Sequence, residues 1–152
     1  MITILKKLLR TDSPYKRIHR GHKPSNVGYE LLTRNNGTKI WLLNGYWHRE
    51  DGPAVHNSNG DKFWSLKGKY HRIGGPAVEY HLGIKEWWQN GELHREDGPA
   101  VKGRGVQRWF LNNTEVTEEK FNEVWNCPLD RLPLYINTPL APIVRRRLSH
   151  GA

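Results

Sequence analysis

A fourteen-residue segment that begins with tryptophan recurs in the middle of this chain at a nearly constant spacing. Its copies are WLLNGYWHREDGPA at 41–54, WSLKGKYHRIGGPA at 64–77 and WWQNGELHREDGPA at 87–100, and a partial fourth copy, WFLNN, begins at 109. Successive tryptophans lie 23, 23 and 22 residues apart. A repeat of this length encodes a supersecondary unit that must stack on its neighbours to bury its apolar side chains. The chain is therefore a repeat protein.

Turn residues divide each unit into short extended stretches. The pairs Asn44-Gly45, Lys67-Gly68 and Asn90-Gly91 follow the tryptophan strands, and a Gly-Pro pair interrupts the next stretch at 52–53, 75–76 and 98–99. Such pairs are typical of hairpin turns and strand edges. We expect a mainly β protein in which antiparallel hairpins stack into a sheet of about 3.5 repeats of 23 residues, with a C-terminal capping helix and flanking tails.

The units occupy only the middle of the chain. We expect a basic N-terminal arm at 1–26, the hairpin array at 27–114, a capping helix at 115–127 and a Pro-rich basic tail at 128–152. Thr117 followed by Glu118 and Glu119 is typical of a helix N-terminus. A helix at this point would cover the exposed edge of the last hairpin. The tail contains enough apolar residues to pack back along the array.

The net charge of +9 is unevenly distributed. Residues 1–24 carry +6 and residues 128–152 carry +3, whereas the array at 25–114 carries +3 and residues 115–127 carry −3. A basic arm on a nearly balanced body suits an acidic or polyanionic partner, and a solubilising, poorly ordered end is the alternative. The single cysteine excludes an internal disulfide. Because no run of about 18 apolar residues occurs, we expect no transmembrane segment and a cytoplasmic protein.

The period of about 23 residues and the core N-G-x-x-H resemble the MORN repeat and its shorter MORN-like variants. The fuller form W-x-x-N-G-x-x-H-R-x-D-G-P-A is similar to repeats of bacteriophage and large DNA virus proteins, whereas MORN repeats usually place a glycine directly after the histidine. The resemblance covers about 37 to 125. It implies an elongated antiparallel sheet that acts as a binding scaffold, and a phage accessory protein located in the cytoplasm of an infected host cell.

The run His-Arg-Glu-Asp invites a catalytic interpretation, because a histidine beside carboxylates can transfer protons. However, it occurs at both 48–51 and 94–97, and the middle copy, His71-Arg72-Ile73-Gly74, lacks both acids. We therefore expect a structural role, with the aspartates capping the turn before Gly-Pro, and no enzymatic activity, cofactor or metal site. The residues assigned to the frame of the repeat are Trp41, Trp64, Trp87, Trp109, His48, His71, His94, Asp51, Asp97, Gly52, Gly75 and Gly98.

The leading functional hypothesis is a scaffold that binds a host protein with an acidic surface. The alternative is nucleic-acid, nucleotide or phosphate binding through a row of arginines and exposed stacking rings, and weak contact of residues 1–10 with a membrane surface is a third hypothesis. Open sheet edges could also pair into a homo-oligomer. The candidate binding residues are Lys6, Lys7, Arg10, Lys16, Arg17, Arg20, Arg49, Arg72, Arg95, Tyr46, Trp47, Tyr70, Trp88, Arg145, Arg146 and Arg147.

Overall fold

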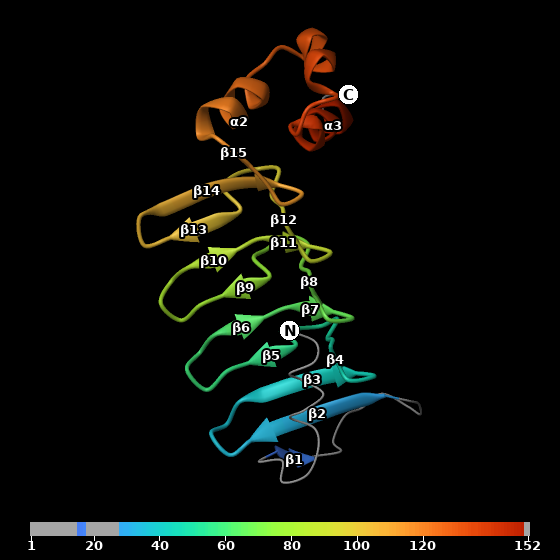
Figure 1. The fold of residues 1–152 in the computed structure, drawn as a ribbon, viewed down its shortest axis with the longest axis vertical. Helices are drawn as coiled ribbons and strands as arrows, with labels where there is room; N and C mark the ends of the chain where they lie inside the picture. Colours follow the sequence, from blue (N-terminus) through green and yellow to red (C-terminus); the bar gives the residue numbers. More distant parts are fainter. Residues whose placement is uncertain (1–14, 18–27, 151–152) are drawn as a thin grey trace.

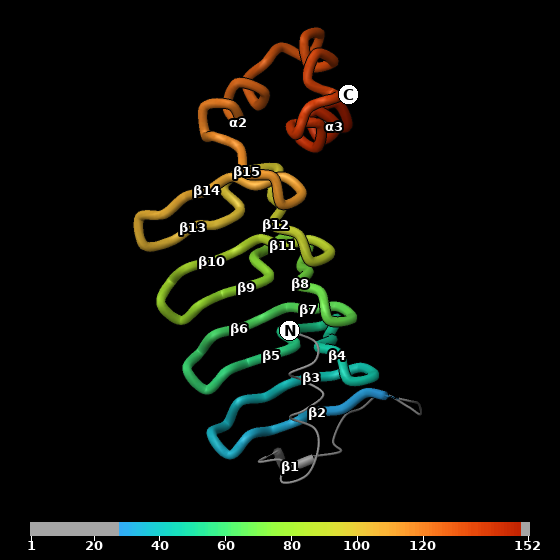
Figure 2. The backbone as a smooth tube through the Cα atoms, in the orientation of Figure 1, coloured from blue at the N-terminus to red at the C-terminus, as the bar shows by residue number. Residues whose placement is uncertain are grey.

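The computed structural model describes residues 15–17 and 28–150, and these form an elongated stack of hairpins followed by helices (Figure 1). Consecutive hairpins lie one above another along the long axis, from β2 to β14, and the helices lie at the C-terminal end. The backbone trace in Figure 2 shows that each unit contributes a long hairpin on one side and a short hairpin on the other. The prediction of a mainly β stack of hairpins is confirmed.

The strands form one large antiparallel sheet and two small ones. In spatial order the large sheet contains β1 (Tyr15–Arg17), β2 (Tyr29–Arg34), β3 (Lys39–Leu43), β5 (Val55–His56), β6 (Lys62–Phe63), β9 (Val78–Glu79), β10 (Lys85–Glu86), β13 (Val101–Gly103), β14 (Val106–Leu111) and β15 (Thr114–Val116), and β4 (Tyr46–Trp47) pairs with β3. The small sheets pair β7 (Ser65–Leu66) with β8 (Lys69–Tyr70), and β11 (Trp88–Gln89) with β12 (Glu92–Leu93). Each small sheet is a short hairpin of the repeat.

The short hairpins turn through pairs of residues with positive φ. Asn44 and Gly45 have φ values of 52° and 80°, and the equivalent pairs are Lys67 with Gly68 and Asn90 with Gly91. Two consecutive positive φ values give a turn whose twist matches that of the flanking strands. In the fourth unit Asn112 and Asn113 adopt the same conformation, at 50° and 62°, because asparagine tolerates the left-handed region.

The large sheet has one apolar face. Strand register places Ile40, Val55, Phe63 and Val78 opposite one another on successive strands. Leu32, Ile40, Leu42 and Val55 are buried there, with Trp47 and Phe63 packed against them. The alanines of the Gly-Pro-Ala segments, Ala54, Ala77 and Ala100, have no exposed surface. Their carbonyl groups accept hydrogen bonds from the backbone N–H groups of the repeat tryptophans at 2.7 to 2.8 Å, so each unit closes on its own first residue.

Helices follow the last strand and share a separate apolar core with it. They are α2 (Glu118–Trp125), the 3-10 helix η1 (Leu129–Tyr135) and α3 (Ala141–His150). The Thr117 side chain accepts a hydrogen bond from the Lys120 backbone N–H at the start of α2. The core contains Leu111 of β14 together with Phe121, Val124, Leu132, Leu140, Ile143 and Val144. None of the helices in the described part of the chain has the length and apolarity that a bilayer span requires.

The segment at 128–152, predicted as a Pro-rich tail, differs from that expectation. Its described residues form η1 and α3, which contact one another and α2 and share a core with β14 instead of extending back along the array. Pro133 lies inside η1, and Pro142 lies in the first turn of α3. Proline is tolerated in a first helical turn because the N–H that it lacks has no intrahelical acceptor there. The prolines of this segment are therefore compatible with the helices η1 and α3.

Candidate functional site

Each repeat contains an arginine held between an indole ring and a glycine. The Cζ atoms of Arg49, Arg72 and Arg95 lie 4.2, 3.9 and 4.0 Å from the ring centres of Trp41, Trp64 and Trp87. A Cβ atom on Gly52, Gly75 or Gly98 would lie 2.9, 3.1 or 3.3 Å from the same Cζ atoms. The glycine of Gly-Pro-Ala therefore leaves room for the guanidinium group, which stacks on the ring by a cation–π contact. The predicted arginine row exists, but it is built into the repeat.

The same guanidinium groups have acidic partners. Arg49 Nε lies 2.8 Å from Asp51 Oδ1, and Arg95 Nε lies 2.7 Å from Asp97 Oδ1. The middle copy lacks that aspartate, and Arg72 Nη1 donates instead to Glu79 at 3.1 Å and to the Pro76 carbonyl at 3.0 Å. The two aspartates, predicted as turn caps, thus bind the arginines of their own repeats.

The repeat histidines join neighbouring units. Each Nδ1 accepts a backbone N–H of the next short-hairpin turn, at 3.0, 3.1 and 3.2 Å for His48, His71 and His94, from Lys67, Asn90 and Asn112. An accepting Nδ1 leaves the ring proton of a neutral imidazole on Nε2. His48 and His94 are buried. A proton-transfer role would require a ring nitrogen facing substrate, whereas the same bond is made in every copy.

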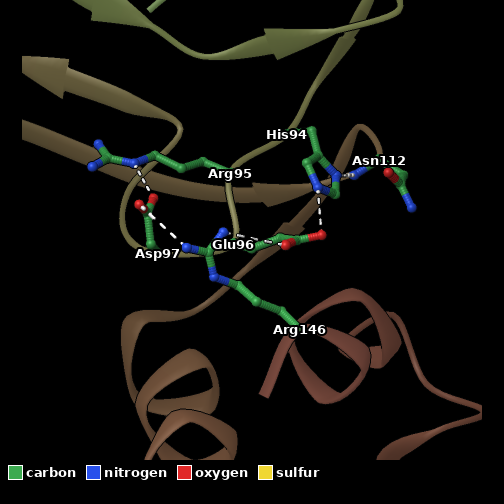
Figure 3. A network of polar contacts seen from close by, with 6 residues as sticks. All are labelled: His94, Arg95, Glu96, Asp97, Asn112 and Arg146. Atoms are coloured by element: carbon green, nitrogen blue, oxygen red, sulfur yellow. Dashed lines mark hydrogen bonds and ion pairs between the residues drawn. The ribbon is translucent and has the colours of Figure 1, made fainter. Parts of the chain in front are cut away.

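The third copy has an additional contact with helix α3 (Figure 3). Arg146 of α3 lies 3.6 Å from Glu96 and 4.0 Å from Asp97, and Glu96 in turn lies 3.2 Å from His94 Nε2. Although burial opposes it, the hydrogen bond from Arg95 and the charges of Arg95 and Arg146 lower the pKa of Asp97. This network connects the third repeat to α3.

The turns of the long hairpins form a second set of contacts. Thr38 Oγ1 accepts from the Ser58 backbone N–H at 3.2 Å. At the equivalent position of the next unit, Asp61 Oδ1 accepts from the backbone N–H of His81 at 2.8 Å and lies 2.7 Å from its Nδ1. The backbone hydrogen bond from His81 is the largest of the effects that lower the pKa of Asp61 to about 2. Among the described residues, no group of His, Cys, Asp or Glu could hold a metal ion.

Aromatic side chains gather on the apolar face of the array. Trp47, Phe63 and Tyr70 have ring centres 6.0 to 6.3 Å apart, Tyr70 lies 5.6 Å from Trp88, and Phe63 lies 6.0 Å from Tyr80. Burial, followed by the charges of Tyr80 and Glu86, raises the pKa of Tyr70. Three of the predicted stacking rings, Trp47, Tyr70 and Trp88, are therefore half-buried against other rings, whereas Tyr46 is 49% exposed.

The opposite face carries a row of lysines that the sequence analysis missed. Lys39 pairs with His56, His56 with Lys62, Lys62 with Glu79, Glu79 with Lys85, and Lys85 with Lys102. Paired residues on adjacent strands share a face. Lys39 and Lys62 directly precede Ile40 and Phe63 of the apolar row, so the lysines point to the opposite face. The signal was present, because a lysine precedes the first three repeat tryptophans by two residues. We call Lys39, Lys62, Lys85 and Lys102 the lysine row.

The remaining candidate residues lie in the edge strand β1, in α3 or outside the described residues. Lys6, Lys7, Arg10 and Arg20 are outside the described ranges, and Lys16 and Arg17 are in β1. On α3, Arg145 is exposed. Arg147 donates to the backbone carbonyls of Val124, at 2.8 Å, and Cys127, near the end of α2. Arg147 is thus used within the helical part.

The comparisons with known proteins add no assignment. The chain matches no protein-family model, no curated protein and no solved structure. The geometry of the repeat and its two faces is consequently the basis for functional inference.

Proposed function

We propose that this protein is a non-enzymatic interaction scaffold, an accessory protein of the bacteriophage type that binds a host protein with an acidic surface. The three histidines, which could serve in catalysis, make one and the same contact, and this observation carries the proposal. Each Nδ1 accepts the backbone N–H of the next unit at 3.0 to 3.2 Å. Active sites are built from convergent groups of different kinds, and a contact repeated in every copy supports a structural role.

The arginines and acids of the repeat support the same conclusion. Each arginine stacks on its tryptophan and binds a carboxylate within its own unit, as Arg72 binds Glu79 at 3.1 Å. We further propose that about 3.5 repeats make up the array and that α2 closes it by covering the last hairpin. An elongated sheet of stacked units offers a long surface for a partner, as in other repeat architectures.

The sign of the charge indicates the chemistry of the partner. The chain carries a formal net charge of +9, of which residues 1–24 contribute +6. Such a charge attracts acidic partners over distances of about a Debye length and accelerates their association. An acidic protein surface fits this charge.

The proposal is tested by capture from a bacterial lysate. The immobilised protein is incubated with lysate in the presence and absence of nuclease, and the retained proteins are identified. We expect one or a few acidic proteins to be retained after nuclease treatment and released by high salt, and a purified partner to bind the protein in a titration. Capture that disappears with nuclease would favour the nucleic-acid alternative, and capture no greater than on bare beads would refute the scaffold.

A further inference from the structure

We infer that the lysine row of the large sheet is the binding surface, and that its ligand is a short, extended acidic segment of a protein. This inference rests on the proposed function and names the face and the partner chemistry. The two kinds of cation on the array differ: the repeat arginines Arg49, Arg72 and Arg95 have carboxylate partners, and the four lysines of the row have none among the described residues.

The row is a product of strand register. From Lys39 to Lys102 the register crosses five strand-to-strand steps, from β3 through β5, β6, β9 and β10 to β13. Adjacent strands lie about 4.8 Å apart, so the row extends over roughly 24 Å, with roughly 10 Å between lysines two strands apart. Side chains on such a sheet face point away from the backbone in parallel. The ammonium groups therefore form a line along the long axis of the array.

The charge of this line is not compensated on the array. Within residues 28–150, none of the four lysines makes an ion pair or a side-chain hydrogen bond. The one acid in the same register row, Glu79, lies 3.1 Å from Arg72 Nη1. Lys39, Lys85 and Lys102 are exposed and Lys62 is half-buried. Exposed cations about 10 Å apart repel one another only weakly in water, and an anionic ligand that spans the row would gain attraction from all four.

The positions of the aromatic rings favour a protein ligand over a single nucleic-acid strand. Proteins that bind single strands combine cations with aromatic rings that stack on the bases along one groove. In this sheet Phe63 follows Lys62 directly, so the two side chains point to opposite faces. On that other face the rings of Trp47 and Tyr70 pack with Phe63, and the ring of Trp88 packs with Tyr70. The tryptophans that follow Lys39, Lys62 and Lys85 by two residues share the lysine face, but each of their rings already carries a stacked arginine guanidinium. The lysine row therefore offers charge beside rings on which an arginine already occupies the place of a base.

The length of the row sets the length of the ligand. An extended chain advances about 3.3 to 3.6 Å per residue, so roughly seven residues lie along the 24 Å that five strand spacings give. Carboxylates of successive acidic residues would then reach every lysine. A tract of about eight glutamates should fill the row, whereas four should reach only half of it.

The probe for the test is fluorescein-labelled octaglutamate, with tetraglutamate, a twenty-nucleotide single strand and a duplex of the same length as comparisons. Binding is followed by fluorescence anisotropy at two salt concentrations. The row variant replaces Lys39, Lys62 and Lys85 by glutamine. The control variant removes the same charge elsewhere, by glutamine at Lys67 and Lys69 of the β7–β8 hairpin and at Arg131 of η1. If glutamine at Lys62 impairs folding, the double variant of Lys39 and Lys85 replaces the triple one.

We expect wild type and the control variant to bind octaglutamate with similar affinity, within about twofold. The row variant should bind about tenfold more weakly, since each exposed ion pair contributes roughly a factor of two to three. Tetraglutamate should bind more weakly than octaglutamate. Equal losses in both variants would overturn the assignment of the face, and tighter binding of either nucleic acid through the row would overturn the ligand class. If the wild-type protein does not bind octaglutamate but captures a protein from the lysate, this inference is wrong and the proposed scaffold function stands.

Discussion

The guanidinium carbon of Arg72 lies 3.9 Å from the centre of the Trp64 ring, and the same side chain donates hydrogen bonds to Glu79 and to the Pro76 carbonyl. One arginine thus connects the tryptophan strand, the Gly-Pro-Ala segment and the following strand of its unit. A lysine would retain the charge but could neither stack a planar group on the ring nor donate in two directions from one fork. The arginine is therefore a structural element of the repeat.

We expect Arg72→Lys to lower the free energy of unfolding by about 1 to 2 kcal/mol, which combines a lost cation–π contact with a weakened charged hydrogen bond. Urea denaturation followed by circular dichroism measures the change. Arg104→Lys, in the exposed β13–β14 turn, is the control and should leave stability unchanged. Equal stability of the Arg72 and Arg104 variants would show that the stacked arginine contributes nothing beyond its charge.

The glycine beside this arginine gives a second prediction. A Cβ on Gly75 would lie 3.1 Å from Arg72 Cζ, so Gly75→Ala should displace the guanidinium group from the Trp64 ring and cost about 1 to 3 kcal/mol, as overpacking does. In an Arg72→Ala background the same substitution should cost much less, because the atom that it meets has been removed. A double-mutant cycle measures this coupling. If the two losses of stability were additive, the cost of Gly75→Ala would come from the backbone and not from a clash with Arg72.

The hairpin stack could be predicted from sequence because its turns are local. Positive φ values are expected at Asn44-Gly45 and Asn90-Gly91 and are found there, because few other residue pairs adopt this conformation. The contacts that join the units could not be predicted in the same way. His48 Nδ1 accepts from the Lys67 backbone, 19 residues further on, and only the stacking of two units brings these atoms together. The histidines invited a catalytic interpretation because the groups that donate to their Nδ1 atoms are backbone N–H groups, which leave no sequence signal.

The candidate binding face was missed for a related reason. A lysine recurs two residues before Trp41, Trp64 and Trp87 and is therefore part of the repeat. The sequence does not show, however, that these lysines lack acidic partners. That property depends on Arg72, which binds Glu79 at 3.1 Å, and hence on the folded unit. Conversely, arginines that seemed available for phosphates are occupied by indole rings and aspartates. Pairing of charges in three dimensions decides which cations remain for a ligand.

Because the three histidines make the same contact, replacing any of them should lower the stability by a comparable amount, with no single dominant loss. Replacing His48, His71 or His94 by alanine leaves a backbone N–H of the next turn without its acceptor, and an unsatisfied buried donor costs about 1 to 3 kcal/mol. We expect the losses at the buried His48 and His94 to exceed the loss at the half-buried His71. Asparagine at each position should recover part of the stability, because its side-chain oxygen can replace Nδ1 as acceptor. Thermal unfolding of the six variants tests this. A dominant functional defect in one variant of unchanged stability would instead indicate an active site.

Asp61 makes the stability of the array depend on pH. Its pKa is lowered from 3.8 to about 2, first by the hydrogen bond from the His81 backbone. Because the folded state binds the proton less tightly than the unfolded state, ionised Asp61 stabilises the fold above about pH 4, and this contribution is lost as pH falls toward 2. In Asp61→Asn the acceptor remains but the charge does not. The stability difference between wild type and this variant should therefore shrink between pH 4 and 2. Urea titrations at each pH measure this difference. The contributions of the other carboxylates are the same in both proteins and therefore cancel. A difference that persists at pH 2 would contradict the lowered pKa.

Two substitutions distinguish what holds the C-terminal helices on the array. Arg146 lies 3.6 Å from Glu96 and is 37% exposed, and a long, partly exposed ion pair contributes at most about 1 kcal/mol. Leu132, in contrast, has no exposed surface and lies in the core that β14 shares with α2 and α3. We expect Arg146→Gln to lower the free energy of unfolding by less than about 1 kcal/mol and Leu132→Ala to lower it by about 2 to 4 kcal/mol.

Raising the salt concentration should reduce the small effect of the arginine and leave that of the leucine unchanged, since screening acts on charges alone. If the arginine variant lost as much stability as the leucine variant, the polar network of Figure 3 would be the main attachment of the helices, and apolar packing would be secondary.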